Sequence, residues 1–130
     1  MISLTIYSAI DIDRELGDRK GPYCIVKFQN IEIARTKSSY ENNEEPFWNE
    51  TFAIPFHKLE GKVTENQRPF FFEYVEVEFY LSPETIECNG RARVRLINIE
   101  RPEWCRVIAM IGKKQGTCCA RILVGLTVNT

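Results

Sequence analysis

The sequence predicts an all-β fold, an antiparallel eight-stranded β-sandwich. Apolar and polar residues alternate over short stretches, turn residues separate these stretches, and no convincing run repeats at the helical period. The 130 residues fit one domain with an ordinary core, because a compact chain of this size buries roughly two thirds of its unfolded surface. We therefore expect residues 1–130 to form a single domain. The same length and composition fit a domain excised from a larger signalling protein.

Eight stretches carry the strand pattern. Apolar side chains at Ala92, Val94 and Leu96, for example, alternate with arginines, as expected of a strand with one buried face. The strand candidates cover residues 2–7, 24–28, 31–37, 48–54, 73–81, 91–96, 103–111 and 119–128.

Turn residues separate these strands. Gln29-Asn30 predicts a tight hairpin link, and Gly112 to Gly116 closes the last hairpin. A single helical turn fits residues 57–60 or 83–87.

Composition excludes several functions. The net charge of −1 argues against attraction of the whole molecule to nucleic acid, so electrostatic binding requires local clusters of charge. No apolar run is long enough to cross a bilayer and no leader is visible, so we expect a cytoplasmic protein with five reduced cysteines. The lone histidine, His57, has no nucleophile at a defensible spacing, and no glycine motif binds phosphate. We expect no catalysis, no cofactor and no metal.

Several segments carry a resemblance to a known family. The first is Leu4 to Ala9, and the most specific is Pro46-Phe47-Trp48-Asn49-Glu50-Thr51-Phe52. With Gly21 to Phe28 and Arg35 to Lys37, they resemble the first four strands of C2 domains in order and spacing. The final strand, residues 120–128, suggests the circularly permuted (type II) topology. Within the family, the C2 domains of Ras GTPase-activating proteins look most similar, and the Glu103-Trp104 pair contributes to that likeness.

The resemblance also bears on calcium. Calcium-binding C2 domains use about five loop aspartates, because the ion needs six to eight oxygen ligands. This chain has only Asp11, Asp13 and Asp18, and Gly21 stands where an aspartate usually precedes Pro-Tyr. We therefore expect a calcium-independent member, although Glu15, Glu84 and Glu87 leave one weak ion conceivable.

Basic residues on three strands predict a binding surface. Residues two apart in a strand share a face, so Arg91, Arg93 and Arg95 stand side by side. In C2 domains this strand shares a sheet with the two strands that contribute the other cations. We define the basic face as Lys27, Arg35, Lys37, Arg91, Arg93 and Arg95. Ile25 stands where the family often has lysine, and Glu32, Glu73, Glu76 and Glu78 offer neutralisation, so a plain solvated face stays open as the alternative.

The loops add further candidates. Arg19, Lys20 and Ile86 are expected to face a membrane, and Phe70-Phe71-Phe72 would mark a partner site if it were exposed. The sequence thus predicts a monomeric, peripheral membrane-targeting module that binds phosphoinositide or phosphatidylserine through the basic face. The alternative is a protein–protein module that packs against a signalling partner or a neighbouring domain.

Overall fold

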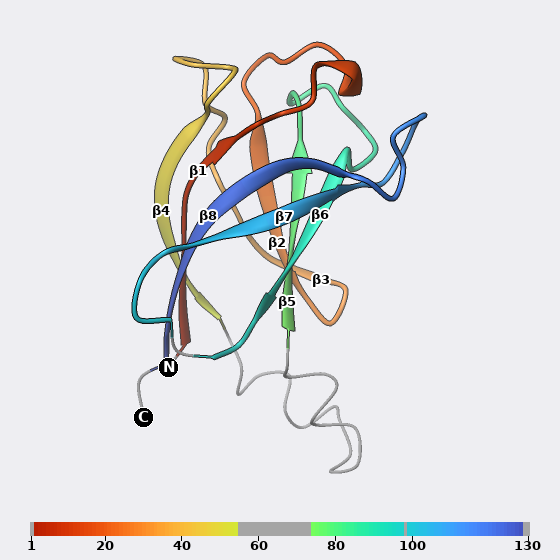
Figure 1. The fold of residues 1–130 in the computed structure, drawn as a ribbon. Helices are drawn as coiled ribbons and strands as arrows, with labels where there is room; N and C mark the ends of the chain where they lie inside the picture. The colour runs from red at the N-terminus through yellow and green to blue at the C-terminus, as the bar shows by residue number, and fades with distance from the viewer. Residues whose placement is uncertain (1, 55–73, 98, 129–130) are drawn as a thin grey trace.

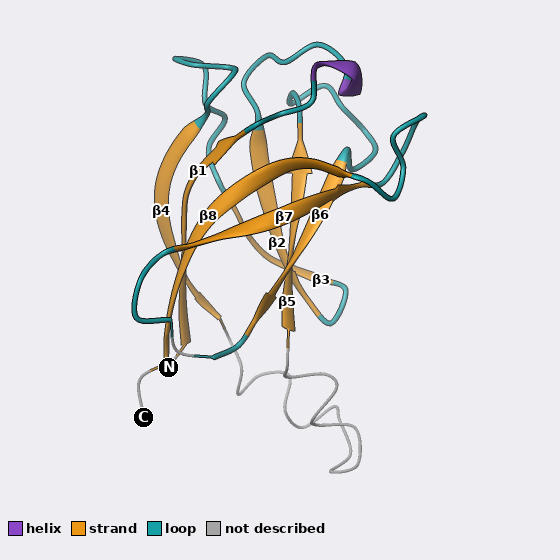
Figure 2. Ribbon diagram, in the orientation of Figure 1, coloured by secondary structure: helices purple, strands orange, loops and turns teal. Residues whose placement is uncertain are grey.

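The computed structural model describes residues 2–54, 74–97 and 99–128 of the chain. The described residues form strands and loops with one short 3₁₀ helix (Figure 2). The predicted all-β antiparallel fold of eight strands is confirmed. The strands are β1 (Ile2–Ile10), β2 (Tyr23–Phe28), β3 (Ile31–Arg35), β4 (Phe47–Ile54), β5 (Tyr74–Tyr80), β6 (Gly90–Arg95), β7 (Glu103–Ala109) and β8 (Cys118–Val128).

The strands build two stacked layers. Their order is β3-β2-β5-β6-β7-β8-β1-β4, and every neighbouring pair is antiparallel. In this order, β3, β2, β5 and β6 form one layer, and β7, β8, β1 and β4 form the other (Figure 1). Only two residue pairs, Gly90 with Ala109 and Arg91 with Ile108, join β6 to β7. The two strands diverge beyond these pairs, so the β6–β7 ladder connects the two layers only at one corner (Figure 1).

The core fills the space between the layers. Alternate residues of each strand point inward, as for Leu4 and Ile6 on β1 and Val26 and Phe28 on β2, all fully buried. At the corner, a Cβ added to Gly90 would lie 2.5 Å from Val107 Cγ1. The corner therefore needs glycine at this position to let β6 approach β7.

The loops agree with the expected turn chemistry in most places. Gln29 and Asn30 both have positive φ angles of 54° and 63°, as a two-residue hairpin link of the predicted kind requires. Residues 83–87 hold a turn rather than a helix, with the Thr85 N–H donating to Ser82 O. The helical turn lies instead at Arg14–Leu16, where the Asp13 carboxylate accepts the Glu15 N–H. The other helical candidate, residues 57–60, lies outside the described residues, as do His57, Phe70 to Phe72 and Glu73.

Four loops gather at one end of the sandwich, residues 11–22, 36–46, 81–89 and 110–117 (Figure 1). Backbone hydrogen bonds tie neighbouring loops together, for example from Lys20 N to Leu81 O and from Met110 N to Asn89 O. These loops carry more carboxylates than cations, so positive charge concentrates on the flanks of the sandwich. No helix among the described residues has the length and apolar character needed to pass through a bilayer.

Candidate anion-binding face

The outer surface of the β3-β2-β5-β6 layer carries most of the basic face. The strand register places Ile25, Glu78 and Arg91 in one row across the layer. The next row holds Lys27, Glu76 and Arg93. The predicted cations are thus brought together, but the central strand β5 places a carboxylate between the cations of β2 and β6.

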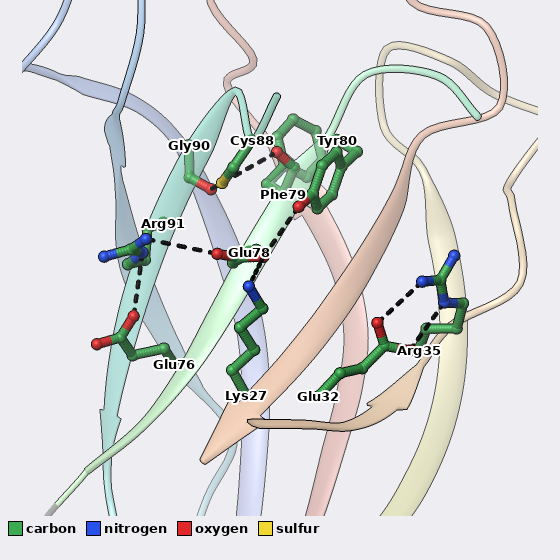
Figure 3. A network of polar contacts seen from close by, with 10 residues as sticks. All are labelled: Lys27, Glu32, Arg35, Glu76, Glu78, Phe79, Tyr80, Cys88, Gly90 and Arg91. Carbon is green, nitrogen blue, oxygen red and sulfur yellow. Dashed lines mark hydrogen bonds and ion pairs between the residues drawn. The ribbon is translucent and has the colours of Figure 1, made fainter. Parts of the chain in front are cut away.

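Glu78 is the centre of this arrangement (Figure 3). Its side chain is only 3% exposed, yet its carboxylate lies 3.2 Å from Lys27 Nζ and 3.4 Å from Arg91 Nη2. The Tyr80 hydroxyl donates a further hydrogen bond of 2.9 Å to it. A buried carboxylate is costly unless its charge is paired and hydrogen-bonded, and these three partners meet that need. Lys27 and Arg91 are therefore held by Glu78 rather than projecting freely into solvent.

Glu76 repeats the pattern one row away. Arg91 Nε lies 3.0 Å from one Glu76 oxygen but does not donate a hydrogen bond to it, and Arg93 Nε lies 3.9 Å from the other. Arg93 is 68% exposed and its contact is long, so its guanidinium remains accessible. Arg95, opposite Tyr74 in the register, is also exposed.

Arg35 lies at the edge of the same layer. Its guanidinium donates two hydrogen bonds to Glu32, of 3.1 and 2.9 Å, and lies 5.7 Å from the centre of the Tyr23 ring. The hydrogen bond from Arg35 lowers the pKa of Glu32. The Tyr23 ring in turn stacks on Tyr80, with centroids 4.9 Å apart. Arg35 thus packs on an aromatic pair while half of its surface faces solvent.

Lys37 is the one predicted member that lies apart. It follows the end of β3, and its backbone N–H donates a 2.8 Å hydrogen bond to Glu50 of β4. Its side chain lines a separate hollow of about 380 Å³, together with Tyr40 and Phe47. The sequence pattern could not show this, because the strand that Lys37 was expected to extend ends at Arg35.

Two ionisable groups beside Glu78, the Cys88 thiol and the Tyr80 hydroxyl, have raised pKa values. Burial raises the pKa of the Cys88 thiol to about 11, and the nearby Glu78 charge adds to the effect. Burial and the hydrogen bond to Glu78 likewise raise the pKa of Tyr80. Both groups therefore stay protonated at neutral pH and supply no activated nucleophile.

The loop candidates differ in accessibility. Ile86 is 94% exposed at the tip of the 81–89 loop, and Lys20 is also exposed. The Arg19 side chain is only 13% exposed, because it lies 3.6 Å from Glu44 and 3.4 Å from the Ile12 carbonyl oxygen that accepts its hydrogen bond. Ile86 and Lys20 can reach an approaching surface, whereas Arg19 mainly holds two loops together.

The loop carboxylates are spread out. Asp13 accepts the Glu15 N–H and lies 3.8 Å from Lys114 Nζ, which also lies 3.4 Å from Glu15. Within residues 2–54, 74–97 and 99–128, no three acidic, histidine or cysteine side chains gather as a metal site would require. The ammonium group of Lys114 lies beside the carboxylates of Asp13 and Glu15, so a calcium ion binding there would compete with it.

Two further arginines escaped the sequence reasoning. Arg106 of β7 and Arg121 of β8 face each other directly in the strand register and are both exposed. Each lies in an alternating stretch that predicts its outward direction, but only the register shows that they are neighbours.

A comparison with family models identifies the class. A model described as C2 domain matches residues 1–103, and the chain belongs to this family. No curated protein matches the chain.

Solved structures share the fold at low sequence identity. A C2 domain-containing protein from a putative elicitor-responsive gene has a TM-score of 0.70 at 15% identity, covering 98% of this chain and 87% of that one. A C2 domain of plant extended synaptotagmin 1 has a TM-score of 0.61 at 18% identity, covering 99% and 95%. Human GIVD cytosolic phospholipase A2 has a TM-score of 0.55 at 12% identity, and the match covers 97% of this chain and 16% of that one. C2 domains are generally non-catalytic modules that bind membrane lipids or proteins, and some occur within enzymes.

Proposed function

We propose that this C2 domain is a non-catalytic, calcium-independent module that binds anionic phospholipid through the basic face. One observation carries the proposal: cations from β2, β3 and β6 share the outer surface of one layer and outnumber the carboxylates described there. Arginine pairs well with phosphate because its planar guanidinium donates two parallel hydrogen bonds. Arg35, Arg93 and Arg95, which are exposed, make the first contacts with head groups.

The charge distribution favours docking on the flank. The loop end is acidic and repels an anionic surface, whereas the basic face lies along the side of one layer. Lys20 and Ile86, which are exposed in the loops at the end of the sandwich, then touch the membrane beside the docked basic face. In this orientation the protein is a monomeric, peripheral membrane protein of the cytoplasm.

Calcium independence rests on the loop residues. The chain has three aspartates, and Asp13 is already engaged by the Glu15 N–H and by Lys114. Chelation with EGTA should leave vesicle binding unchanged, and titration calorimetry should detect no calcium binding in the micromolar range. A chelator-sensitive melting temperature would contradict this part of the proposal.

The place of the domain in a larger protein is a further part of the proposal. β8 lies between β7 and β1, which supports the permuted topology. The resemblance to C2 domains of Ras GTPase-activating proteins suggests that residues 1–130 deliver such a signalling protein to the membrane. The coding sequence on either side of this segment tests that relation directly.

Vesicle sedimentation tests the lipid-binding surface. Each basic residue near an anionic bilayer contributes about 1 kcal/mol, so the double variant Arg35→Gln/Arg95→Gln should bind phosphoinositide vesicles about thirtyfold more weakly. Arg91 is left unchanged because its guanidinium pairs with the buried Glu78. The single variant Arg101→Gln, exposed in a loop away from the face, provides the charge-matched control for each single replacement.

The expected binding weakens at high salt, because exposed charges are screened. If Arg35→Gln and Arg95→Gln each bind as well as Arg101→Gln, the basic face is not the lipid site.

A protein partner is the second candidate function. Tyr40 and Phe47 are exposed by 61% and 65% and line the Lys37 hollow, where aromatic rings beside a cation suit a protein surface. In that case Tyr40→Ala/Phe47→Ala would abolish partner capture and leave vesicle binding unchanged.

A further inference from the structure

Three arginines from three strands form a row at the corner where the layers separate. Arg93 lies on β6, Arg106 on β7 and Arg121 on β8. The β6–β7 ladder stops at the pair Arg91 and Ile108, and two further residues along the same register would place Arg93 opposite Arg106. Arg106 is the direct partner of Arg121 in the β7–β8 ladder. Arg106 and Arg121 are therefore direct neighbours, whereas Arg93 is separated from Arg106 because β6 and β7 diverge beyond Arg91 and Ile108, as Figure 1 shows.

A hollow of about 620 Å³ is lined by residues of both diverging strands. We define the seam groove as its lining residues, Arg91, Arg93, Cys105, Arg106, Ile108 and Met110. Its volume lies in the range of small-molecule sites, about 300–1,000 Å³. Apolar groups from β7 and the residue after it lie beside the guanidinium groups, so the groove combines a hydrophobic lining with positive charge.

The charges here lack the compensation found around Glu78. Arg93 shares Glu76 with Arg91, at the long distance of 3.9 Å. For Arg106 and Arg121, no carboxylate in the described part of the chain lies within ion-pairing distance. Like charges directly opposite on neighbouring strands are destabilising. An anion bound between these guanidinium groups removes that repulsion.

We propose that the seam groove, together with Arg121, binds a small anion carrying two or more phosphates, of the inositol phosphate class. Cations on both sides of the opening match phosphates separated by a rigid ring, and each guanidinium can hold a phosphate with two hydrogen bonds. No aromatic ring lines the described groove, so it offers no stacking surface for the base of a nucleotide. The seam groove shares Arg91 and Arg93 with the basic face, but the other four residues of that face do not line it, and Arg106 belongs to the groove alone.

Soluble inositol hexakisphosphate tests the site on the whole chain. We expect calorimetry to show binding to the wild-type protein, and Arg106→Gln/Arg121→Gln to weaken it at least tenfold. Both side chains are exposed, so these replacements should preserve the fold. The control Arg14→Gln/Arg101→Gln removes the same charge from two exposed loop positions and should change affinity less than twofold. Trp104 lies two residues from Arg106 on the same face of β7 and is partly exposed, so its fluorescence offers a second readout.

A vesicle experiment distinguishes the two sources of the phosphate groups. Vesicles containing phosphatidylinositol bisphosphate are compared with the soluble compound, using the same variants. Soluble binding that depends on Arg106 and Arg121 supports a free ligand, and dependence seen with vesicles alone supports a lipid head group. Equal losses in the seam variant and the control overturn the proposal, as does absence of binding in both formats.

The basic face can fail independently of this result. If Arg35→Gln/Arg95→Gln binds vesicles like the wild type while Arg106→Gln/Arg121→Gln does not, the result supports the seam groove and contradicts the basic face as the lipid site. If Arg106→Gln/Arg121→Gln binds both vesicles and soluble inositol hexakisphosphate like the wild type while Arg35→Gln/Arg95→Gln does not, the seam groove is refuted.

Discussion

The arginines on the two sides of the β6–β7 corner have opposite surroundings. Around β6, the adjacent strand β5 places Glu76 and Glu78 among the cations, and one of these carboxylates is almost fully buried. On β7 and β8, Arg106 and Arg121 meet each other, with no described carboxylate within ion-pairing distance. Within the conspicuous arginine run of the sequence, Arg91 is therefore held between two carboxylates, and Arg93 has a long contact with one of them. The dispersed arginines form the less compensated positive surface.

The difference shows what a strand pattern can and cannot report. Alternation indicates which way a side chain points, but charge compensation depends on the neighbouring strand. The two sides of the corner can be distinguished by four changes, from a large loss of stability to a small gain.

Removing the buried carboxylate should have the largest effect. Glu78→Gln removes the buried carboxylate that pairs with Lys27 and leaves Arg91 with Glu76 alone, so we expect the free energy of unfolding to fall by about 3 kcal/mol. Glu76→Gln, at a more exposed carboxylate on the same strand, should cost less than about 1 kcal/mol. Urea unfolding measures both, and equal losses would show that Glu78 does not organise the layer.

The corner itself should be sensitive to one methyl group. Gly90→Ala places a Cβ against Val107 Cγ1 and Cys119 Sγ, and we expect a loss of about 2 kcal/mol. Val107→Ala removes the nearest group, so the double variant should lose less than the sum of the two single variants. Strict additivity in urea unfolding would mean that close packing at Gly90 is not the reason for the loss.

Alkaline pH should weaken the β5–β6 side through Cys88. Burial raises its pKa from 9.0 to about 11 in the folded protein, so the unfolded chain loses the thiol proton at lower pH. Stability is then fully present below pH 9 and falls as pH rises from about 9 to 11, by about 1 kcal/mol per pH unit for this group. The variant Cys88→Ser removes this contribution, and unfolding measured at several pH values should show a shallower alkaline slope. An unchanged slope would assign the alkaline loss to the other buried thiols or to Tyr80.

The smallest effect is a gain in stability. Arg106→Gln removes the repulsion with Arg121, so we expect the free energy of unfolding to rise by about 0.5 kcal/mol at low salt. The gain should shrink at high salt, because exposed charges are screened. Arg93→Gln, next to Glu76 on the other side of the corner, should show no such gain. Equal changes in the free energy of unfolding of the two variants, measured with urea, would show that the arginines on the two sides of the corner do not differ in charge compensation.

Much of the fold was predictable from the sequence. Trp48 is buried and Phe52 is half-buried against the core, as their alternation on one strand predicts, and Phe47 is exposed. The Gln29-Asn30 hairpin followed from turn chemistry that is local to two residues. The short helix at residues 14–16 was missed because a single turn capped by one aspartate has no periodicity to detect.

The candidate site was predictable only in part. Lys27, Arg91, Arg93 and Arg95 lie on one layer as expected, since the family resemblance placed their strands in one sheet. The burial of Glu78, the departure of Lys37 and the pairing of Arg106 with Arg121 depend on register between strands distant in the sequence.

The sequence by itself determined the number of strands, their inward and outward faces and the C2 class, because these follow from alternation, turn residues and motifs within short segments. Only the tertiary structure decided which charges meet. An ion pair forms when oppositely charged side-chain atoms come within about 4 Å of each other, and residues far apart in the chain, such as Lys27 and Glu78, become neighbours only when the sheet is assembled.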